Sequence, residues 1–299
     1  MYDCIIIGMG PAGMSAAVYA KRSGLKVLCL EKSAPGGLIN STNIVDNFIG
    51  YDNISGPDLA YKMFEHILNE EIEYKIEEVI DIENLKSKKI VKTVNSTYET
   101  KTIIICTGRQ KKKPNIEKKF NLTGKGISYC AICDAALYKN KPVAVIGGGN
   151  SAFEEGVYLA NICSKVYIIN RNDTLRADEI LINNAKACKN IEIIKPFDIE
   201  TVNLLNDKIS SVVLNNKREI DVKAIFVYIG FEPMTDFLNK IDIINDKGYI
   251  EVSDSMRTNV KGIYACGDAI DKGLYQIVTA ASDGAIAATS AKKDISGGK

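Results

Sequence analysis

Short apolar runs followed by helical patterns occur twice along the chain, in the same order and with similar lengths. The first set predicts a strand at residues 2–7, a tight turn, a helix from about 11 to 23 and a strand at 26–30. The second set predicts a strand at 142–146, a helix from about 150 to 161 and a strand at 165–169. Because strand, turn, helix and strand follow one another in both sets, each predicts the beginning of a Rossmann-type α/β unit.

A glycine-rich turn lies between the first strand and the helix of each set. An offset of 139 positions (147 − 8) superposes three pairs of small residues: Gly8 on Gly147, Gly10 on Gly149 and Gly13 on Ala152. In such a turn the first glycine allows the sharp bend, the second lets the backbone approach a pyrophosphate, and the third small residue lets helix and strand pack closely. The positive end of the helix then faces the phosphates. The chain is therefore predicted to contain two dinucleotide sites.

The residue that follows the second strand distinguishes the two sites. In the first set this residue is Glu31, and a carboxylate at this point accepts hydrogen bonds from a ribose diol, which indicates FAD or NAD. The corresponding residue of the second set is Asn170, which is followed by Arg171 and then Arg176. A missing carboxylate with nearby guanidinium groups favours a 2′-phosphate, because arginine binds phosphate through paired hydrogen bonds. The second site is therefore interpreted as an NADP site.

Length and composition agree with two ordinary soluble domains. The chain has 299 residues, of which 46% are hydrophobic, enough for two cores. The formal net charge of +1 argues against electrostatic binding of nucleic acid or anionic lipid. No apolar stretch reaches the ~18 residues that a membrane span needs. The basic run Lys111–Lys113 is interpreted as a solvated connector.

The eight cysteines are scattered, and only one pair is closely spaced. Cys4, Cys29 and Cys106 lie in apolar, strand-like runs, where cysteine behaves as a small buried hydrophobe. This pattern indicates a reduced, cytoplasmic protein, because secreted proteins of this kind would instead show a framework of paired cysteines.

The close pair is formed by Cys130 and Cys133 in the segment Cys-Ala-Ile-Cys-Asp. Zinc would need a second pair or histidines at ligand spacing. The one histidine, His66, lies in an amphipathic helical segment at 57–68, so no metal site and no histidine-based hydrolase is expected. A Cys-x-x-Cys pair can also be the active site of a thioredoxin fold. Here, however, the pair lies between the two Rossmann sets, with no small thioredoxin domain around it.

Thiol–disulfide exchange needs a thiolate, and a helix over Cys130–Leu137 would favour one at its N-terminus. Asp134 directly follows the second cysteine and is the acidic group of the segment that can deliver or accept a proton. The alternative is that Asp134 only completes the first turn of the helix.

These residues together resemble the low-molecular-weight, bacterial-type thioredoxin reductases, FAD-dependent members of the pyridine nucleotide-disulfide oxidoreductases. The resemblance covers nearly the whole chain and rests on a combination of motifs: Gly8 to Gly13, Gly36-Gly37-Leu38 with Asn47, Cys130 to Asp134, Gly147 to Glu155, Ile229 to Pro233 and Ala265 to Asp268. It implies an α/β fold of two Rossmann-like dinucleotide-binding domains of the three-layer ββα type, one inserted into the other. The FAD domain would comprise 1–110 and 241–299, and the NAD(P) domain, with the dithiol, 111–240.

The resemblance also assigns residues to the cofactors and to the reaction. FAD would be held by Gly8, Gly10, Gly13, Glu31, Gly37, Leu38, Asn47, Gly267, Asp268, Gln276 and Ile277, and NADPH by Gly147, Gly149, Ala152, Arg171 and Arg176. Cys133 would face the flavin, Cys130 would attack the disulfide of thioredoxin or a thioredoxin-like protein, and Asp134 would assist protonation. Connectors near 109–114 and 238–242 would be the hinges of a domain rotation, and a homodimer is the family expectation.

Departures from the family pattern cluster on the NADPH side. Typical members have His-Arg-Arg where this chain has Asn170-Arg171-Asn172, an acidic residue in place of Asn150, and an arginine in place of Tyr275. Each lost phosphate contact would cost about 1.5–3 kcal/mol, tenfold or more in affinity. NADH and a reduced protein such as ferredoxin therefore remain alternative donors. Two other functions also remain open: a reductase of a peroxiredoxin system, and a flavin redox sensor without turnover.

Overall fold

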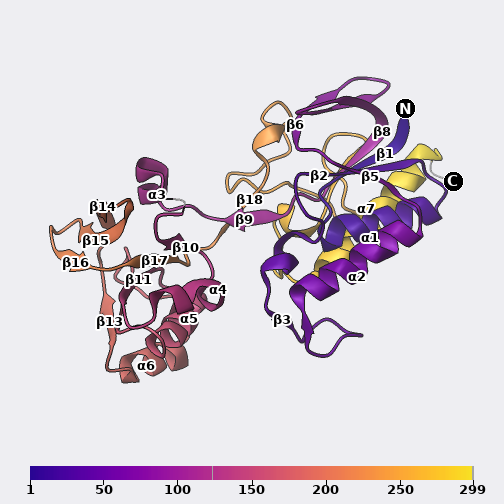
Figure 1. Cartoon of the computed structure of the whole chain (residues 1–299). Helices are drawn as coiled ribbons and strands as arrows, with labels where there is room; N and C mark the ends of the chain where they lie inside the picture. The colour runs from indigo at the N-terminus through magenta and orange to yellow at the C-terminus, as the bar shows by residue number, and fades with distance from the viewer. Residues whose placement is uncertain (123, 298–299) are drawn as a thin grey trace. The chain divides into compact units, whose positions relative to one another are not determined.

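The chain forms two compact units in a computed structural model that describes residues 1–122 and 124–297. The first unit comprises Met1–Gln110 together with the chain from Glu232 onward, and the second comprises Lys111–Phe231. The chain leaves the first unit through β9 (Arg109–Lys111) and returns through β18 (Phe231–Pro233), and these two strands pair with each other. The N-terminal and C-terminal segments, indigo and yellow in Figure 1, thus belong to the same unit.

The return to the first unit lies before position 241, which the sequence analysis takes as the boundary. Leu238, in the short helix η3 (Asp236–Leu238), is fully buried in the same apolar cluster as Ile5 and Ile103 of the first unit. Since its core contacts are with the first unit, the segment 232–240 belongs there and not to the inserted unit.

The first unit is built on a seven-stranded sheet in the order β5-β2-β1-β8-β7-β6, with β19 paired to β8. Neighbours among β1, β2, β5, β8 and β19 are parallel, whereas β6 and β7 continue the sheet in antiparallel pairs. Strands buried on both faces need continuous apolar runs, and Cys4–Ile7 is such a run. The bounds are β1 Tyr2–Ile7, β2 Val27–Glu31, β5 Glu73–Ile76, β6 Val79–Asn84, β7 Lys89–Thr93, β8 Thr97–Ile105 and β19 Ile263–Ala265; a hairpin pairs β3 (Ile44–Val45) with β4 (Ile54–Ser55).

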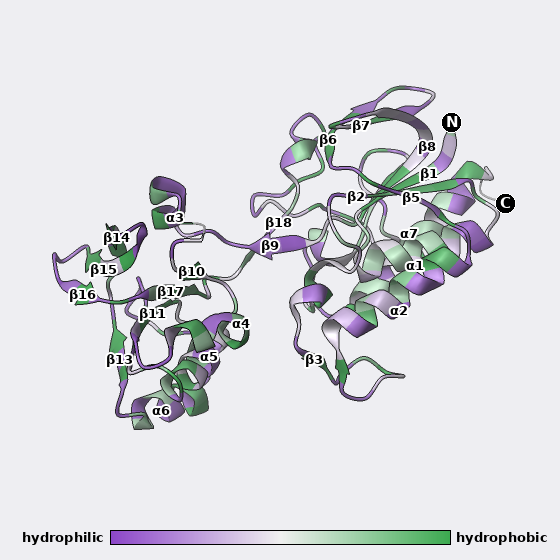
Figure 2. Cartoon of the chain, in the orientation of Figure 1, coloured by the Kyte–Doolittle hydropathy of each residue, from purple (hydrophilic) through white to green (hydrophobic). Residues whose placement is uncertain are grey.

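Three helices accompany this sheet: α1 (Pro11–Arg22), α2 (Gly56–Asn69) and α7 (Ile277–Ile295). Hydrophobic and hydrophilic patches alternate around α1 and α2 in Figure 2, as expected for helices that cover a core on one side. Small residues let α1 and α7 approach closely: a Cβ added at Gly284 would lie 2.1 Å from the carbonyl oxygen of Ala12. Two short 3-10 helices, η1 (Gly37–Ser41) and η4 (Gly267–Ala269), lie in loops of the same unit.

The second unit contains a five-stranded sheet in the order β10-β17-β11-β12-β13 with all neighbours parallel, and a separate antiparallel sheet of β14, β15 and β16. The strands are β10 Ile127–Ser128, β11 Pro142–Ile146, β12 Lys165–Ile169, β13 Ile191–Ile194, β14 Ile199–Leu205, β15 Lys208–Leu214, β16 Glu219–Asp221 and β17 Ala224–Val227. The helices are α3 Asn115–Phe120, α4 Ala131–Asp134, η2 Ala135–Tyr138, α5 Asn150–Ala160 and α6 Glu179–Ala187.

The predicted fold class is confirmed, and both sets of strand, helix and strand form within a residue or two of their expected bounds. Cys4, Cys29 and Cys106 are buried, as predicted. The Lys111–Lys113 run is solvated only in part, because Lys111 is half-buried and its Nζ donates a hydrogen bond to the carbonyl of Tyr129 at 2.6 Å.

None of the helices within residues 1–122 and 124–297 is long and apolar enough to cross a membrane. The same residues contain no group of three or more His, Cys, Asp or Glu side chains that could hold a metal ion.

Candidate functional site

The first glycine turn leads from β1 into α1 and has the geometry of a phosphate site. Gly8 adopts a φ of +97°, and a Cβ added at Gly13 would lie 1.8 Å from the carbonyl oxygen of Gly8, so this helix and strand can meet only without side chains. At Gly10, by contrast, no atom lies within 4 Å of the position of an added Cβ. Gly10 is the N-cap of α1 and offers no side-chain cap, which leaves the first N–H groups of the helix for an anion.

Glu31, the last residue of β2, closes this turn from the neighbouring strand. Its side chain is 8% exposed, and its carboxylate accepts hydrogen bonds from the N–H groups of Met9 at 2.7 Å and Ser33 at 3.1 Å. The carboxylate is thus fixed beside the glycine turn, and its remaining lone pairs can accept further hydrogen bonds.

Residues far apart in the sequence meet at the same turn. A Cβ added at Gly37 would lie 3.5 Å from the Cα of Gly10, and one added at Gly267 would lie 2.7 Å from the Cβ of Ala12. Asn47 and Gln276 are also brought together, with Asn47 Nδ2 donating to Gln276 Oε1 at 3.2 Å. Of the other residues assigned to FAD, Leu38 is half-buried in η1 and Ile277 begins α7.

Asp268, in η4, lies in a cluster of charges that the sequence analysis did not detect. Its carboxylate is 3.0 Å from Nε of Arg109, whose guanidinium also lies over the ring of Tyr275 at 4.2 Å. Lys272 is 3.9 Å from Asp268 and 2.8 Å from Asp283. Burial raises the pKa of Asp268, and the neighbouring Arg109 and Lys272 oppose that rise. Arg109 thus places a cation beside Tyr275.

The second glycine turn leads from β11 into α5 and repeats the phosphate-site geometry. Gly149 is the N-cap of α5 without a side-chain cap, and no atom lies within 4 Å of an added Cβ there. At Gly147 an added Cβ would lie 2.4 Å from the carbonyl oxygen of Tyr228 and 3.0 Å from Cβ of Ala152. Both turns therefore leave open space at the glycine that would approach a pyrophosphate and are packed tightly at the others.

Asn170, which corresponds to Glu31, packs its side-chain amide against the second turn: a Cβ added at Gly148 would lie 2.5 Å from its Oδ1. It is buried, and its Nδ2 donates to the carbonyls of Asn172 at 2.6 Å and Thr174 at 3.2 Å. The backbone N–H of Arg176 donates to the carbonyl of Gly148 at 2.7 Å, so the loop after β12 is fastened to the glycine turn. The side chains of Arg171 and Arg176 are exposed in this loop.

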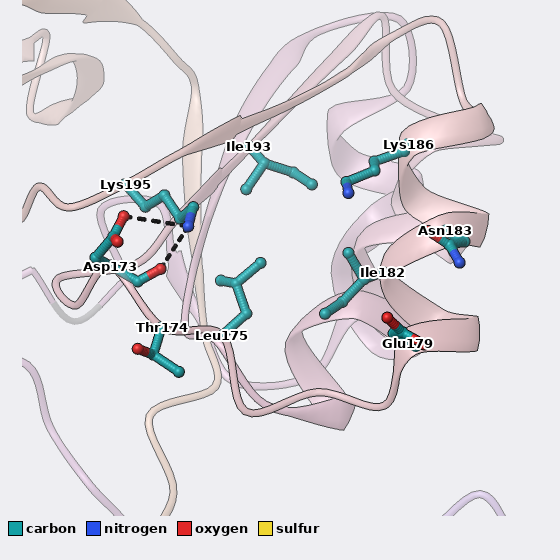
Figure 3. A pocket seen from close by; sticks show the side chains of 9 residues that line it. All are labelled: Asp173, Thr174, Leu175, Glu179, Ile182, Asn183, Lys186, Ile193 and Lys195. Carbon is teal, nitrogen blue, oxygen red and sulfur yellow. Dashed lines mark hydrogen bonds and ion pairs between the residues drawn. The ribbon is translucent and has the colours of Figure 1, made fainter.

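A pocket of about 580 Å³ lies beside the same loop (Figure 3). Lys195, just after β13, donates to the carbonyl of Asp173 at 2.5 Å and lies 3.1 Å from its carboxylate. The lining combines this ion pair with apolar side chains and with polar side chains, some of them on α6. The nine lining residues are Asp173, Thr174, Leu175, Glu179, Ile182, Asn183, Lys186, Ile193 and Lys195. The sequence analysis did not predict Lys195 as a neighbour of the loop, because the two are joined only by strand pairing.

Cys130 and Cys133 form a disulfide with their Cα atoms 5.4 Å apart. Cys130 is the N-cap of α4, and its Sγ accepts a hydrogen bond from the N–H of Cys133 at 3.2 Å. Cys133 is exposed and Cys130 is half-buried. The helix predicted from Cys130 to Leu137 forms as two short pieces, α4 and η2, with Cys130 preceding the first.

Two residues outside the motif hold the dithiol segment, and the sequence analysis missed both. Ser128 Oγ donates to Asp134 Oδ2 at 2.7 Å, and the N–H of Cys130 donates to Ser128 Oγ at 3.1 Å. From the other side, the hydroxyl of Tyr228 accepts from the N–H of Ala131 at 2.9 Å. Burial raises the pKa of Tyr228, so its hydroxyl stays neutral. The apolar residues around Ser128 in the sequence give no signal of this role.

Comparisons with known proteins place this geometry in a family. The family model of the pyridine nucleotide-disulphide oxidoreductases matches residues 2–284. A thioredoxin reductase of Ureaplasma parvum is 44% identical over 301 residues, covering 99% of this chain and 97% of the relative. The crystal structure of Lactococcus lactis thioredoxin reductase (FR conformation) has a TM-score of 0.88 at 39% identity, covering 99% and 100% of the two chains. A ferredoxin-flavin thioredoxin reductase of Clostridium acetobutylicum has a TM-score of 0.56 at 29% identity, covering 99% and 98%.

Proposed function

The chain belongs to the pyridine nucleotide-disulphide oxidoreductases, and we propose that it is a thioredoxin reductase that passes electrons from NADPH through FAD and the Cys130–Cys133 pair to thioredoxin. The observation that supports this most directly is the disulfide itself, which lies in the unit that also holds the second glycine turn. FAD, when bound, supplies the two-electron transfer between the nicotinamide and the disulfide.

The first unit has the features that FAD needs. The uncapped start of α1 and the open space at Gly10 fit a pyrophosphate, and the carboxylate of Glu31 fits a ribose diol. Gly37 and Gly267 border the same turn. In this proposal Leu38, Asn47, Asp268, Gln276 and Ile277 lie along the rest of the cofactor.

The second unit has the features that NADPH needs. Gly147, Gly149 and Ala152 form the phosphate turn, and Arg171 and Arg176 are exposed on the adjoining loop, where they can bind a 2′-phosphate. Asn170 and Asn172 bring no positive charge to this loop, so the grip on the 2′-phosphate rests on the two arginines. NADPH is therefore proposed as the donor, with weaker discrimination against NADH than three arginines would give.

Cys130 and Cys133 would carry out the exchange with thioredoxin. In the reduced state the Cys130 thiolate, which the N–H of Cys133 stabilises, attacks the disulfide of thioredoxin, and one thioredoxin thiolate leaves. Asp134 delivers a proton to this leaving thiolate. Cys133 then attacks the Sγ of Cys130, which releases the second thiolate of thioredoxin and re-forms the disulfide. Two electrons thus pass to thioredoxin, and the dithiol returns to its oxidised form.

Two further properties belong to the same proposal. A homodimer is proposed from the family membership alone, and light scattering of the purified protein measures it. A cytoplasmic location is proposed as well, since the six other cysteines are free and five of them are buried, which fits a reducing compartment.

Anaerobic titration of the flavin-loaded protein with NADPH and, separately, with NADH tests the donor. Bleaching of the flavin absorbance by NADPH, followed by reduction of added thioredoxin, is the expected result. Bleaching by NADH alone would contradict the role of Arg171 and Arg176. Bleaching by dithionite but by neither nucleotide would show that the second dinucleotide turn does not work as a donor site. If reduced ferredoxin then bleaches the flavin, the donor is a protein.

A further inference from the structure

The hydroxyl of Ser128 joins the backbone of the dithiol to the carboxylate of Asp134. Ser128 ends β10, the edge strand of the five-stranded sheet, and is only 4% exposed. Its Oγ accepts from the N–H of Cys130 at 3.1 Å and lies 2.7 Å from Asp134 Oδ2, a normal distance for an O–H···O bond. The carbonyl of Cys130 lies farther away, at 3.2 Å.

The direction of these bonds follows from the chemistry of a hydroxyl group. A serine hydroxyl has one hydrogen to donate, and here the backbone N–H of Cys130 uses its oxygen as an acceptor. The hydrogen is therefore available to the shorter contact, the one with Asp134 Oδ2. A donor aimed at a carboxylate stabilises its ionised form. Among the described residues no hydrogen bond to Asp134 Oδ1 is found, so that oxygen is left for proton transfer.

We propose that Ser128 is a positioning residue for the acid–base step: it holds Asp134 Oδ2 and leaves Oδ1 to exchange the proton with the leaving thiolate. This inference rests on the proposed function of the dithiol. The same hydroxyl also fixes the N–H of Cys130, so that the nucleophile and the proton donor share one anchor. Ser128 acts through its hydrogen bonds to Asp134 and to the backbone of Cys130.

The other titratable groups around Asp134 do not replace it. Tyr138 on η2 and Tyr228 after β17 are close enough to interact with its charge, and burial raises the pKa of both hydroxyls. Beyond Tyr228, on α5, burial also raises the pKa of Glu155, and Lys111 opposes that rise. The tyrosines therefore stay neutral through the working pH range, so neither supplies a charge beside the dithiol.

The test compares Ser128→Ala with the wild type in the flavin-loaded, chemically reduced full chain. The first readout is the protonation of Asp134. It is measured by NMR of the protein with 13C-labelled aspartate as the pH is varied, and Asp134→Asn assigns the signal. Without the serine hydroxyl the midpoint should rise by about one pH unit, because the ionised form loses a charge-assisted hydrogen bond. Ser128→Thr keeps the hydroxyl and should therefore show the wild-type midpoint. If the alanine variant does not fold, the threonine variant is compared with the wild type in its place.

The second readout is the single-turnover reduction of thioredoxin as a function of pH. Ser128→Ala should slow it about ten- to hundredfold and move its pH profile in the same direction as the Asp134 midpoint, while flavin reduction by NADPH stays unchanged. The matched control is Ser211→Ala on β15, because Ser211 is also a buried serine of the second unit that donates to a carboxylate, that of Glu219.

The outcomes separate this inference from the proposed function. An Asp134 midpoint that is the same in Ser128→Ala and the wild type overturns the role of Ser128, whatever the turnover. An equal rate loss at every pH, not rescued by Ser128→Thr, also overturns it, since a merely structural role would give that result. A wild-type chain that reduces no disulfide contradicts the proposed function, and the NMR titration still decides whether Ser128 sets the protonation of Asp134.

Discussion

Replacing Glu31 with alanine should affect folding and cofactor binding separately, because its carboxylate has two sets of partners. In the protein alone it accepts from the N–H groups of Met9 and Ser33. Met9 is fully buried, so in Glu31→Ala its N–H loses its partner away from water, which costs about 1–3 kcal/mol. Ser33 is exposed, and water can replace its bond at little cost. The apoprotein should therefore lose about 1–3 kcal/mol of unfolding free energy.

Cofactor affinity should fall by a further, separate amount. The hydrogen bonds of a ribose diol to an ionised carboxylate contribute about 1.5–3 kcal/mol, which is a ten- to hundredfold change in the dissociation constant of FAD. Urea unfolding of the apoprotein measures the first quantity, and quenching of flavin fluorescence during titration measures the second. Glu31→Gln should show intermediate losses in both, because an amide keeps one acceptor oxygen but presents a donor to the other N–H.

Glu65→Ala is the matched control, since Glu65 is exposed on α2 in the same unit. It should change neither quantity by more than about 0.5 kcal/mol. An apoprotein of Glu31→Ala as stable as this control would refute the argument from the buried N–H of Met9. Unchanged FAD affinity would show that the ribose diol does not bind at Glu31.

Three more changes test other parts of the molecule. Cys133→Ser should abolish reduction of thioredoxin while FAD still binds, and wild-type turnover in single-enzyme assays of this variant would contradict the assigned roles of the two sulfurs. Arg176→Ala should raise the dissociation constant of NADPH about tenfold or more and leave that of NADH unchanged in flavin-bleaching titrations; an equal effect on both would argue against a 2′-phosphate contact. The hydrogen bond from Arg257 lowers the pKa of Asp294, so this pair stabilises the fold above the unfolded-state pKa of about 4 and loses that contribution as the pH falls further. The melting temperature of Asp294→Asn should therefore lie below that of the wild type at neutral pH and converge with it in acid, and a constant difference would contradict this reasoning.

The repeated strand, turn and helix could be predicted from sequence because the responsible signals are local. The apolar run Cys4–Ile7 and the glycines that follow it specify a buried parallel strand and a tight turn within about ten residues. The same holds for the dithiol, because Cys130 at the N-cap of α4 and Cys133 in its first turn are only three positions apart. The sequence predicts the return to the first unit too late, because nothing around Leu238 differs locally from a linker. Only the burial of Leu238 in one cluster with Ile5 and Ile103 assigns it to that unit.

Residues that act across strand pairs could not be predicted in the same way. Arg109 meets Asp268 because β8 and β19 are parallel neighbours and both residues lie just beyond the ends of these strands. Lys195 meets Asp173 for the same reason at β12 and β13. Such pairs depend on strand order, which the sequence pattern does not contain. Ser128 and Asp134 are only six positions apart, yet their contact depends on the turn at Cys130 that joins β10 to α4.

Under the proposed function, the two glycine turns adapt one backbone geometry to two ligands. In the first, the residue after the paired strand is an acceptor: Glu31 takes the N–H of Met9 and keeps a negative charge beside the turn. In the second, Asn170 donates to a carbonyl of its own loop. The bond that ties this loop to the glycine turn runs in the opposite direction, because here the turn accepts: the carbonyl of Gly148 takes the N–H of Arg176. The reversal removes the negative charge that would repel a 2′-phosphate, and it anchors the backbone of an arginine at the same position. The exchange of a carboxylate for an amide thus changes both the charge beside the turn and the direction of the bond that closes it. In the proposed function this one position therefore distinguishes the two cofactors better than the glycines do.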